Sequence, residues 1–150
     1  MTKASLELEA KHVLEYPYRR SVGPVMGRFF GGLKVGRILG VRTRSGRVLV
    51  PPTEYDPETG EAVGEFVEVG TTGAVTSWTW ISQPRAGKHP LKAPFAWALV
   101  QLDGADTALL HAVDAGREAN MKTGMRVRAR FRSEPKGGIQ DIECFEPVAS

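Results

Sequence analysis

The first pattern of apolar residues has the period of a helix and covers residues 21–36. The apolar side chains of SVGPVMGRFFGGLKVG recur at spacings of three and four residues; they are Val22, Val25, Met26, Phe29, Phe30 and Leu33. Within this stretch, Gly23, Gly27, Gly31 and Gly32 lower the intrinsic helix propensity. We therefore predict a helix capped by Ser21 and held by packing, in which Phe29 and Phe30 are either core residues or partner anchors. Upstream, Pro17 predicts an extended segment that packs Tyr16 and Tyr18 onto another surface.

From residue 37 onward the apolar pattern changes to the period of β-strands. RILGVR and RVLV predict a hairpin turned at Arg44-Ser45-Gly46, followed by the loop PPTEYDPETGE. Six further strands are predicted, in GEFVEV, GAVTSWTWIS, PFAWALVQLD, TALLHAV, GMRVRARFR and IQDIECFEP. A short helix in DAGREANMK lies between the third and fourth of the last five strands. Five strands with a helical insertion before the fourth are the order of an OB-fold barrel.

The chain thus divides into three predicted parts within a mainly β protein. Residues 1–36 form an N-terminal extended segment and helical arm, residues 37–66 a small hairpin unit, and residues 67–150 the five-stranded OB-fold barrel.

Composition indicates in which compartment the protein works and which partner classes are excluded. No apolar run approaches 18 residues, and the charged N-terminus has no secretory h-region. Cys144 is the only cysteine, so a disulfide framework is impossible and we expect a cytoplasmic protein with no membrane partner. The net charge of +3 is spread evenly along the chain, which argues against a dominant nucleic-acid surface.

Three clusters are candidate binding elements. The alternating arginines of MRVRARFR, which are Arg126, Arg128, Arg130 and Arg132, are either a phosphate ladder or the solvated outer face of a strand. Trp78 and Trp80 lie on one strand face, where they stack on bases, fill the core or anchor a partner. The loop SQPRAGKHPLKAP carries Arg85, Lys88, His89 and Lys92, and either reaches a ligand phosphate or a neighbouring subunit or is an ordinary solvated loop.

No catalytic constellation is recognisable. His12, His89 and His111 are not spaced for a metal, and we expect His111 to be a hydrogen-bonded core residue. The chain has no GxSxG elbow and no phosphate-binding loop. Nothing near Cys144 in the sequence would generate a thiolate.

The order of these elements resembles an acyl-CoA-associated OB-fold family, once called domain of unknown function 35. The resemblance covers about residues 16–147, and its most specific parts are GRILG, VPP and LDGADTALLH. In that family a rubredoxin-like zinc ribbon precedes the barrel. Aligning on Gly46, Pro51-Pro52, Pro57 and Gly60 places the four ligand positions at Arg42, Ser45, Asp56 and Thr59. These side chains cannot replace four thiolate or imidazole ligands, so we expect a degenerate, metal-free ribbon without zinc, in which an Arg42–Asp56 ion pair partly replaces the metal.

The resemblance also implies a function. Members of the family are accessory subunits of thiolase-like enzymes, and the partner carries the catalytic residues. We expect a heterotetramer of two plus two subunits acting on acyl-CoA thioesters, with retro-aldol cleavage of a steroid side-chain CoA thioester as the favoured reaction. Alternatives are a single-stranded nucleic-acid-binding protein and a stand-alone acyl-CoA-binding protein.

The resemblance also suggests which residues contact the substrate and the partner. No cofactor is expected on this chain alone, and the coenzyme A phosphates of the complex's substrate would meet Arg85, Lys88 and Lys92 or the arginine ladder. The expected partner-interface residues are Phe29, Phe30, Leu33, Trp78 and Trp80.

Overall fold

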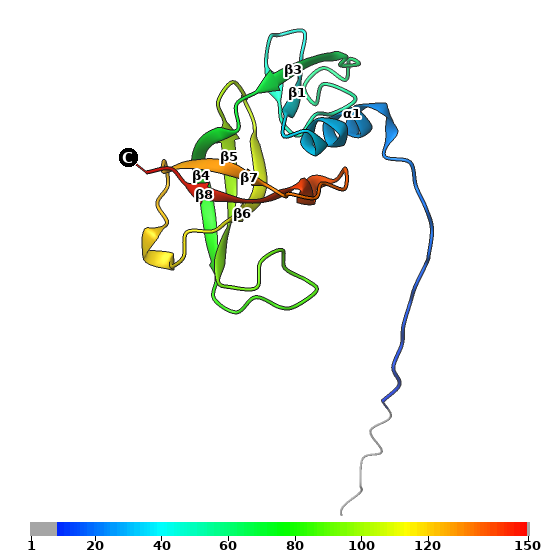
Figure 1. Cartoon of the computed structure of the whole chain (residues 1–150). Helices are drawn as coiled ribbons and strands as arrows, with labels where there is room; N and C mark the ends of the chain where they lie inside the picture. The colour runs from blue at the N-terminus through cyan, green and yellow to red at the C-terminus, as the bar shows by residue number, and fades with distance from the viewer. Residues whose placement is uncertain (1–8, 150) are drawn as a thin grey trace, which may run out of the picture.

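The computed structural model describes residues 9–149 and places a closed five-stranded barrel beside a smaller sheet and one helix (Figure 1). The elements in chain order are α1 (Gly23–Lys34), β1 (Ile38–Arg42), β2 (Val48–Leu49), β3 (Glu65–Val69), β4 (Thr72–Ile81), β5 (Phe95–Leu102), β6 (Ala108–Val113), η1 (Glu118–Asn120), β7 (Arg126–Phe131), η2 (Ile139–Asp141) and β8 (Ile142–Pro147). Within the described residues, no helix is long and apolar enough to cross a bilayer.

The barrel has the strand order β4-β5-β6-β8-β7, and β7 pairs back onto β4. All pairs are antiparallel except β6 with β8. The short helix η1 connects β6 to β7, at the place where the sequence predicted a helical insertion. The predicted OB-fold is therefore confirmed.

Alternation along each strand fills the barrel interior. Val75, Val100, Val113, Val127 and Phe145 have at most 1% of their surface exposed. At the start of β4 the chain requires Gly73, because a Cβ there would lie 2.3 Å from the carbonyl oxygen of Gln101 on β5. A glycine thus permits the close approach of two backbones where the barrel closes.

The second unit is a three-stranded sheet with α1 packed on its central strand. Its order is β2-β1-β3, so β3 extends the predicted hairpin and the sheet runs to Val69, beyond the predicted boundary at residue 66. Val25 of α1 joins Val41, Leu49 and Val63 in a small core of its own. The predicted helix is confirmed, and it begins at Gly23 and ends at Lys34.

Two side chains of α1 that we expected at a partner interface belong to the core. Phe29 and Leu33 have 0% and 1% of their surface exposed and pack with Val48 and Val50 of the β2 segment. They lie on the inward stripe of α1 with Val25, at spacings of four residues. The interface prediction is therefore wrong for Phe29 and Leu33, whereas Phe30 remains partly exposed.

The loop between β5 and β6 fixes the small sheet to the barrel. The backbone N–H of Val48 donates to Asp106 Oδ2 at 2.7 Å, and that of Val50 donates to Thr107 Oγ1 at 2.7 Å. In return, Asp106 N–H donates to the Val48 carbonyl and the Thr107 hydroxyl donates to the Val50 carbonyl. These hydrogen bonds show that the LDGADTALLH stretch joins the small sheet to the barrel.

Candidate functional site

A hollow of about 370 Å³ lies between the predicted basic loop and the barrel wall. Lys88 comes from the loop, Trp97 and Leu110 come from β5 and β6, and Arg132 and Ile139 close the opposite side. Trp97, Leu110 and Ile139 make part of the hollow apolar, while Lys88 and Arg132 bring two cations to it. The one carboxylate in the lining, Glu143, is paired with Arg130. A pocket with an apolar lining and a few cations can hold an amphipathic anion.

The loop around this hollow is shaped by His89. The His89 Nδ1 atom accepts a hydrogen bond from the Arg85 backbone N–H at 2.8 Å, and the carbonyl of Arg85 accepts from the N–H groups of Lys88 and His89. The His89 ring packs against Phe95, which is fully buried and contacts Trp97 edge to face. The barrel therefore anchors the loop and holds Lys88 beside the hollow.

The three predicted phosphate-binding residues do not converge on one point. Lys88 lines both this hollow and a second one of about 400 Å³, where it joins Arg85 and Trp80. Lys92 is exposed and lines neither hollow. The structure thus brings Arg85 and Lys88 together and leaves Lys92 apart. The sequence named Arg132 as a member of the arginine ladder but did not predict that it meets Lys88 at the first hollow, because that approach depends on barrel closure.

Trp78 and Trp80 are half-buried and pack against the barrel core. They face Ala98 and Ala96 of β5, whose small side chains leave room for the indole rings. Stacking platforms for bases are more exposed than this, so their main contribution is packing. That the exposed edges of the two indole rings contact a partner protein remains a prediction.

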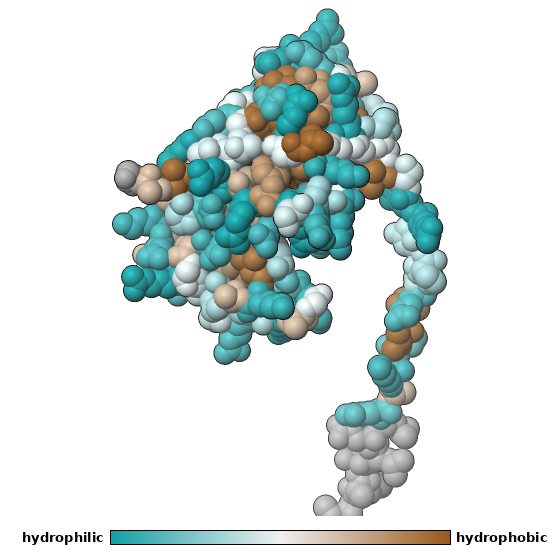
Figure 2. Space-filling model, in the orientation of Figure 1, coloured by the Kyte–Doolittle hydropathy of each residue, from teal (hydrophilic) through white to brown (hydrophobic). Residues whose placement is uncertain are grey.

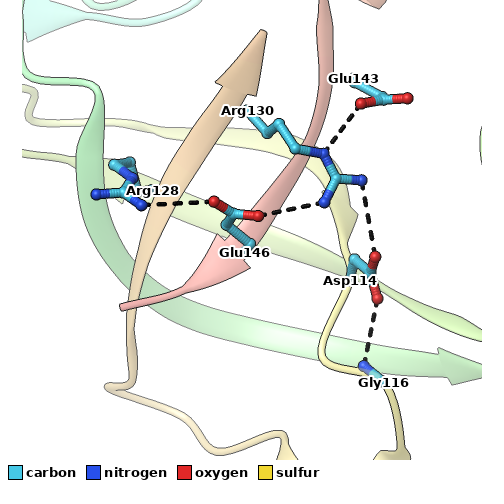
Figure 3. A network of polar contacts seen from close by, with 6 residues as sticks. All are labelled: Asp114, Gly116, Arg128, Arg130, Glu143 and Glu146. Carbon is cyan, nitrogen blue, oxygen red and sulfur yellow. Dashed lines mark hydrogen bonds and ion pairs between the residues drawn. The ribbon is translucent and has the colours of Figure 1, made fainter. Parts of the chain in front are cut away.

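The arginine ladder is neutralised by acidic neighbours (Figure 3). Arg130 pairs with Glu143 at 2.9 Å, with Glu146 at 3.2 Å and with Asp114 at 3.7 Å. Arg128 also reaches Glu146, at 3.5 Å. These arginines form the outer face of β7, as the solvated-face interpretation predicted, and are not free to bind a row of phosphates.

Arg126 and Arg132 complete this strand. Arg126 makes a two-pronged pair with Asp103 at 2.9 and 2.5 Å, and this pairing lowers the pKa of the Asp103 carboxyl. Arg132 makes no ion pair with another described residue and is the ladder member that lines the hollow.

His111 is a core histidine, as expected. Its Nδ1 atom accepts the Ala112 backbone N–H at 2.9 Å, and Nε2 lies 3.4 Å from the Ile139 carbonyl. Burial lowers the pKa of this imidazole, so the ring is neutral and Nε2 carries the proton. The ring also packs edge to face on Phe145, which gives it a structural role.

The remaining buried titratable groups are also unsuited to nucleophilic chemistry. Cys144 is buried, and burial raises the pKa of its thiol to about 11, so it is protonated at neutral pH. Burial acts to raise the pKa of the Asp141 carboxyl, but N–H donors from Lys136, Gly137 and Gly138 outweigh it and the net shift is downward. Asp141 therefore shapes the turn before β8.

The four positions aligned with zinc ligands are each engaged elsewhere. Arg42 pairs with Glu65 at 3.2 Å, and Asp56 accepts the Glu58 N–H at 2.9 Å, so the predicted Arg42–Asp56 ion pair is wrong. Ser45 shares a hydrogen bond with Thr43, and Thr59 accepts the Glu61 N–H. An arginine, two hydroxyls and one carboxylate do not fit a structural zinc ion, which takes four thiolate or imidazole ligands.

Other ion pairs hold the two turns of this unit together. Arg47 pairs with Glu58, and Arg44 pairs with Glu61 at 3.1 Å. Both pairs bridge the turn after β1 to the DPETG knuckle, as the predicted pair would have done. Because Arg44 and Glu58 are well exposed, each pair contributes at most about 1 kcal/mol. Most of the order of this unit then comes from its small apolar core.

Comparisons with known proteins agree with this architecture. The family model for the C-terminal OB-fold domain of ChsH2 matches residues 66–132. A protein of unknown function from the DUF35 family of Sulfolobus solfataricus aligns with 27% identity and a TM-score of 0.58, over 71% of this chain and 78% of that one. A chain of the Ltp2-ChsH2(DUF35) aldolase aligns with 22% identity and a TM-score of 0.63, over 86% of this chain and 98% of that one. The search of curated proteins finds no match. Residues 66–132 are therefore similar to the C-terminal OB-fold domain of ChsH2, and the fold is shared with a DUF35 protein.

Proposed function

We propose that this chain is a non-catalytic accessory subunit of a thiolase-like enzyme that acts on acyl-CoA thioesters. The observation that carries the proposal is the likeness to the Ltp2-ChsH2(DUF35) aldolase, which spans 86% of this chain and 98% of the matched chain. The shared architecture includes the parts outside the barrel as well as the barrel itself. The name of that aldolase joins two components, Ltp2 and ChsH2, and we propose the same arrangement for this chain.

The chemistry of the described residues supports an accessory role. Two candidate base or nucleophile side chains are engaged or protonated: both ring nitrogens of the buried His111 are hydrogen-bonded to backbone groups, and the Cys144 thiol has a pKa of about 11. The catalytic groups would then belong to the partner.

The finer parts of the proposal concern the substrate and the assembly. We place the coenzyme A phosphates near Arg85 and Lys88, with the apolar part of the hollow available to the pantetheine or acyl chain. The favoured reaction is retro-aldol cleavage of a steroid side-chain CoA thioester, in a cytoplasmic heterotetramer of two plus two subunits. The nucleic-acid alternative is less well supported, because Arg126, Arg128 and Arg130 are already paired with carboxylates.

Co-expression tests the proposal. The tagged chain is produced with each thiolase-like protein encoded in the same genome, and complexes are sized by light scattering. The proposal predicts that one of these proteins co-purifies in a two-plus-two complex. If none forms a stable complex with the chain, the accessory role is rejected.

Substrate kinetics of the complex test the phosphate site. Lys88→Ala is expected to raise the KM for an acyl-CoA and leave the KM for the matching acyl-pantetheine, which lacks the adenosine phosphates, unchanged. Lys122→Ala, which removes another exposed lysine, serves as the matched control. Equal effects of Lys88→Ala on both substrates would refute the phosphate assignment.

A further inference from the structure

The exposed apolar side chains of this protein are concentrated at one place. Half of the large hydrophobic side chains that are exposed among the described residues lie between residues 13 and 22; they are Val13, Leu14, Tyr16, Tyr18 and Val22, with 54–76% of their surface exposed. This segment leaves the body of the protein beside α1 and runs free alongside it (Figure 1). Its apolar residues stand out in Figure 2, separated from the body. So much apolar surface on one short segment marks an interaction element.

The composition of the segment is that of an interface anchor. Residues 16–20 read Tyr-Pro-Tyr-Arg-Arg, and tyrosine and arginine are among the residue types that dominate binding energy at protein interfaces. Pro17 fixes one backbone angle and thereby reduces the conformational entropy lost on binding. No side chain of residues 9–20 makes a hydrogen bond or ion pair with another described residue, so nothing within residues 9–149 competes for these groups.

The apolar surface continues from the segment onto α1. Val22, Met26 and Phe30 recur every four residues along the flank of the helix, beside the buried stripe that includes Phe29. Val22 is exposed, whereas Met26 and Phe30 are half-buried and pack partly against the main core. Together with Arg20 and Ser21 these three residues line a hollow of about 310 Å³.

We propose that residues 13–22 and the exposed parts of Met26 and Phe30 on the flank of α1, which together we call the docking arm, form one continuous contact with the thiolase-like subunit. This inference rests on the function proposed above and names the part of the chain that makes the contact. The surface it requires on the partner is an apolar groove that takes the two tyrosines and the flank of α1. We expect carboxylates at the rim of this groove, because Arg19 and Arg20 are exposed cations without an ion pair in the described part of the chain.

Binding measurements on the purified complex test the docking arm. The probe is the thiolase-like protein that co-purifies with the wild-type chain. Replacing both tyrosines, as Tyr16→Ala with Tyr18→Ala, is expected to raise Kd by roughly a hundredfold, since each hot-spot side chain accounts for about a tenfold change or more. The matched control is Tyr55→Ala, which removes a tyrosine that is 60% exposed elsewhere on the chain and is expected to leave Kd unchanged. Arg19→Glu with Arg20→Glu is expected to weaken binding and to reduce its dependence on salt.

Limited proteolysis gives a second readout that does not depend on substitutions. Trypsin cleaves after lysine and arginine, and Lys11, Arg19 and Arg20 all lie in the exposed segment. The free chain is expected to be cut there within the first minutes, and the complex is expected to be protected.

The possible outcomes separate this inference from the proposed function. A stable wild-type complex that keeps its affinity after the tyrosine substitutions, or whose arm is cut as fast as in the free chain, rejects the docking arm alone. Failure of the wild-type chain to bind any thiolase-like protein rejects the proposed function, and the docking arm with it.

Discussion

The assignment of Phe29 to the core can be tested with a single substitution. Phe29 has 0% of its surface exposed, lies 5.6 Å from the Phe30 ring between centroids, and packs in the main core cluster. Phe29→Ala removes a buried aromatic ring and leaves a cavity, which costs about 3–5 kcal/mol in the free energy of unfolding. A domain of this size has only about 5–15 kcal/mol in total. With about 2–4 °C lost per kcal/mol, we expect Tm to fall by roughly 6–20 °C.

Urea titration followed by tryptophan fluorescence measures this loss. Tyr18→Ala is the control, because Tyr18 is exposed and its removal should change the free energy of unfolding by less than about 0.5 kcal/mol. If Phe29→Ala unfolds within about 1 kcal/mol of the wild type but no longer binds the partner, Phe29 is an anchor and the packing described here is wrong.

Three further predictions concern the ion-pair network, the buried histidine and the small sheet. Arg130→Met removes three ion pairs from a side chain that is 37% exposed, and should lower the free energy of unfolding by about 1 kcal/mol in low salt and less at about 1 M salt. Urea titration measures this loss beside the control Arg117→Met, which removes an exposed arginine that has no ion pair in the described part of the chain. Because the pKa of His111 is lowered in the folded state, the unfolded chain binds its proton first, so stability is full above the unfolded pKa of about 6.5 and declines as pH falls below it. His111→Gln should flatten that decline in urea titrations at several pH values, and an unchanged slope would assign it to other groups. Metal analysis of the purified protein should find no stoichiometric zinc, since Arg42, Ser45, Asp56 and Thr59 do not form a ligand set.

The barrel was predictable because its strands and turns obey local rules. Alternating residues and glycine-containing turns marked the strands, and the position of the DAGREANMK insertion gave their order. The pairing of β3 with β1 was not predictable in this way, because GEFVEV has the same alternation whether its partner lies in the small sheet or in the barrel.

The orientation of α1 shows a second limit. Its sequence carries two apolar stripes, one with Phe29 and one with Phe30, and helical periodicity cannot say which faces inward. The position of the sheet beneath the helix determines which of the two stripes is buried. The stripe with Phe29 is fully buried, and the stripe with Phe30, which is only half-buried beside the core, belongs to the docking arm.

Ion pairs were the hardest feature to predict. The alternation of MRVRARFR placed its arginines on one face, but their acidic partners come from β8 and from the loops after β5 and β6. The same holds in the small unit, where the two turns are joined through Arg44 and Arg47 and not through Arg42. Such pairs depend on tertiary contacts that sequence spacing does not encode.

Thioester turnover by the separated and recombined components tests the central claim most directly. The isolated chain, the thiolase-like protein and their purified complex are each incubated with an acyl-CoA. The release of coenzyme A and the cleavage of the acyl chain are followed over time. We predict that the isolated chain has no activity and that turnover requires the thiolase-like protein and is highest in the complex. Turnover by the rigorously purified chain alone would contradict the account.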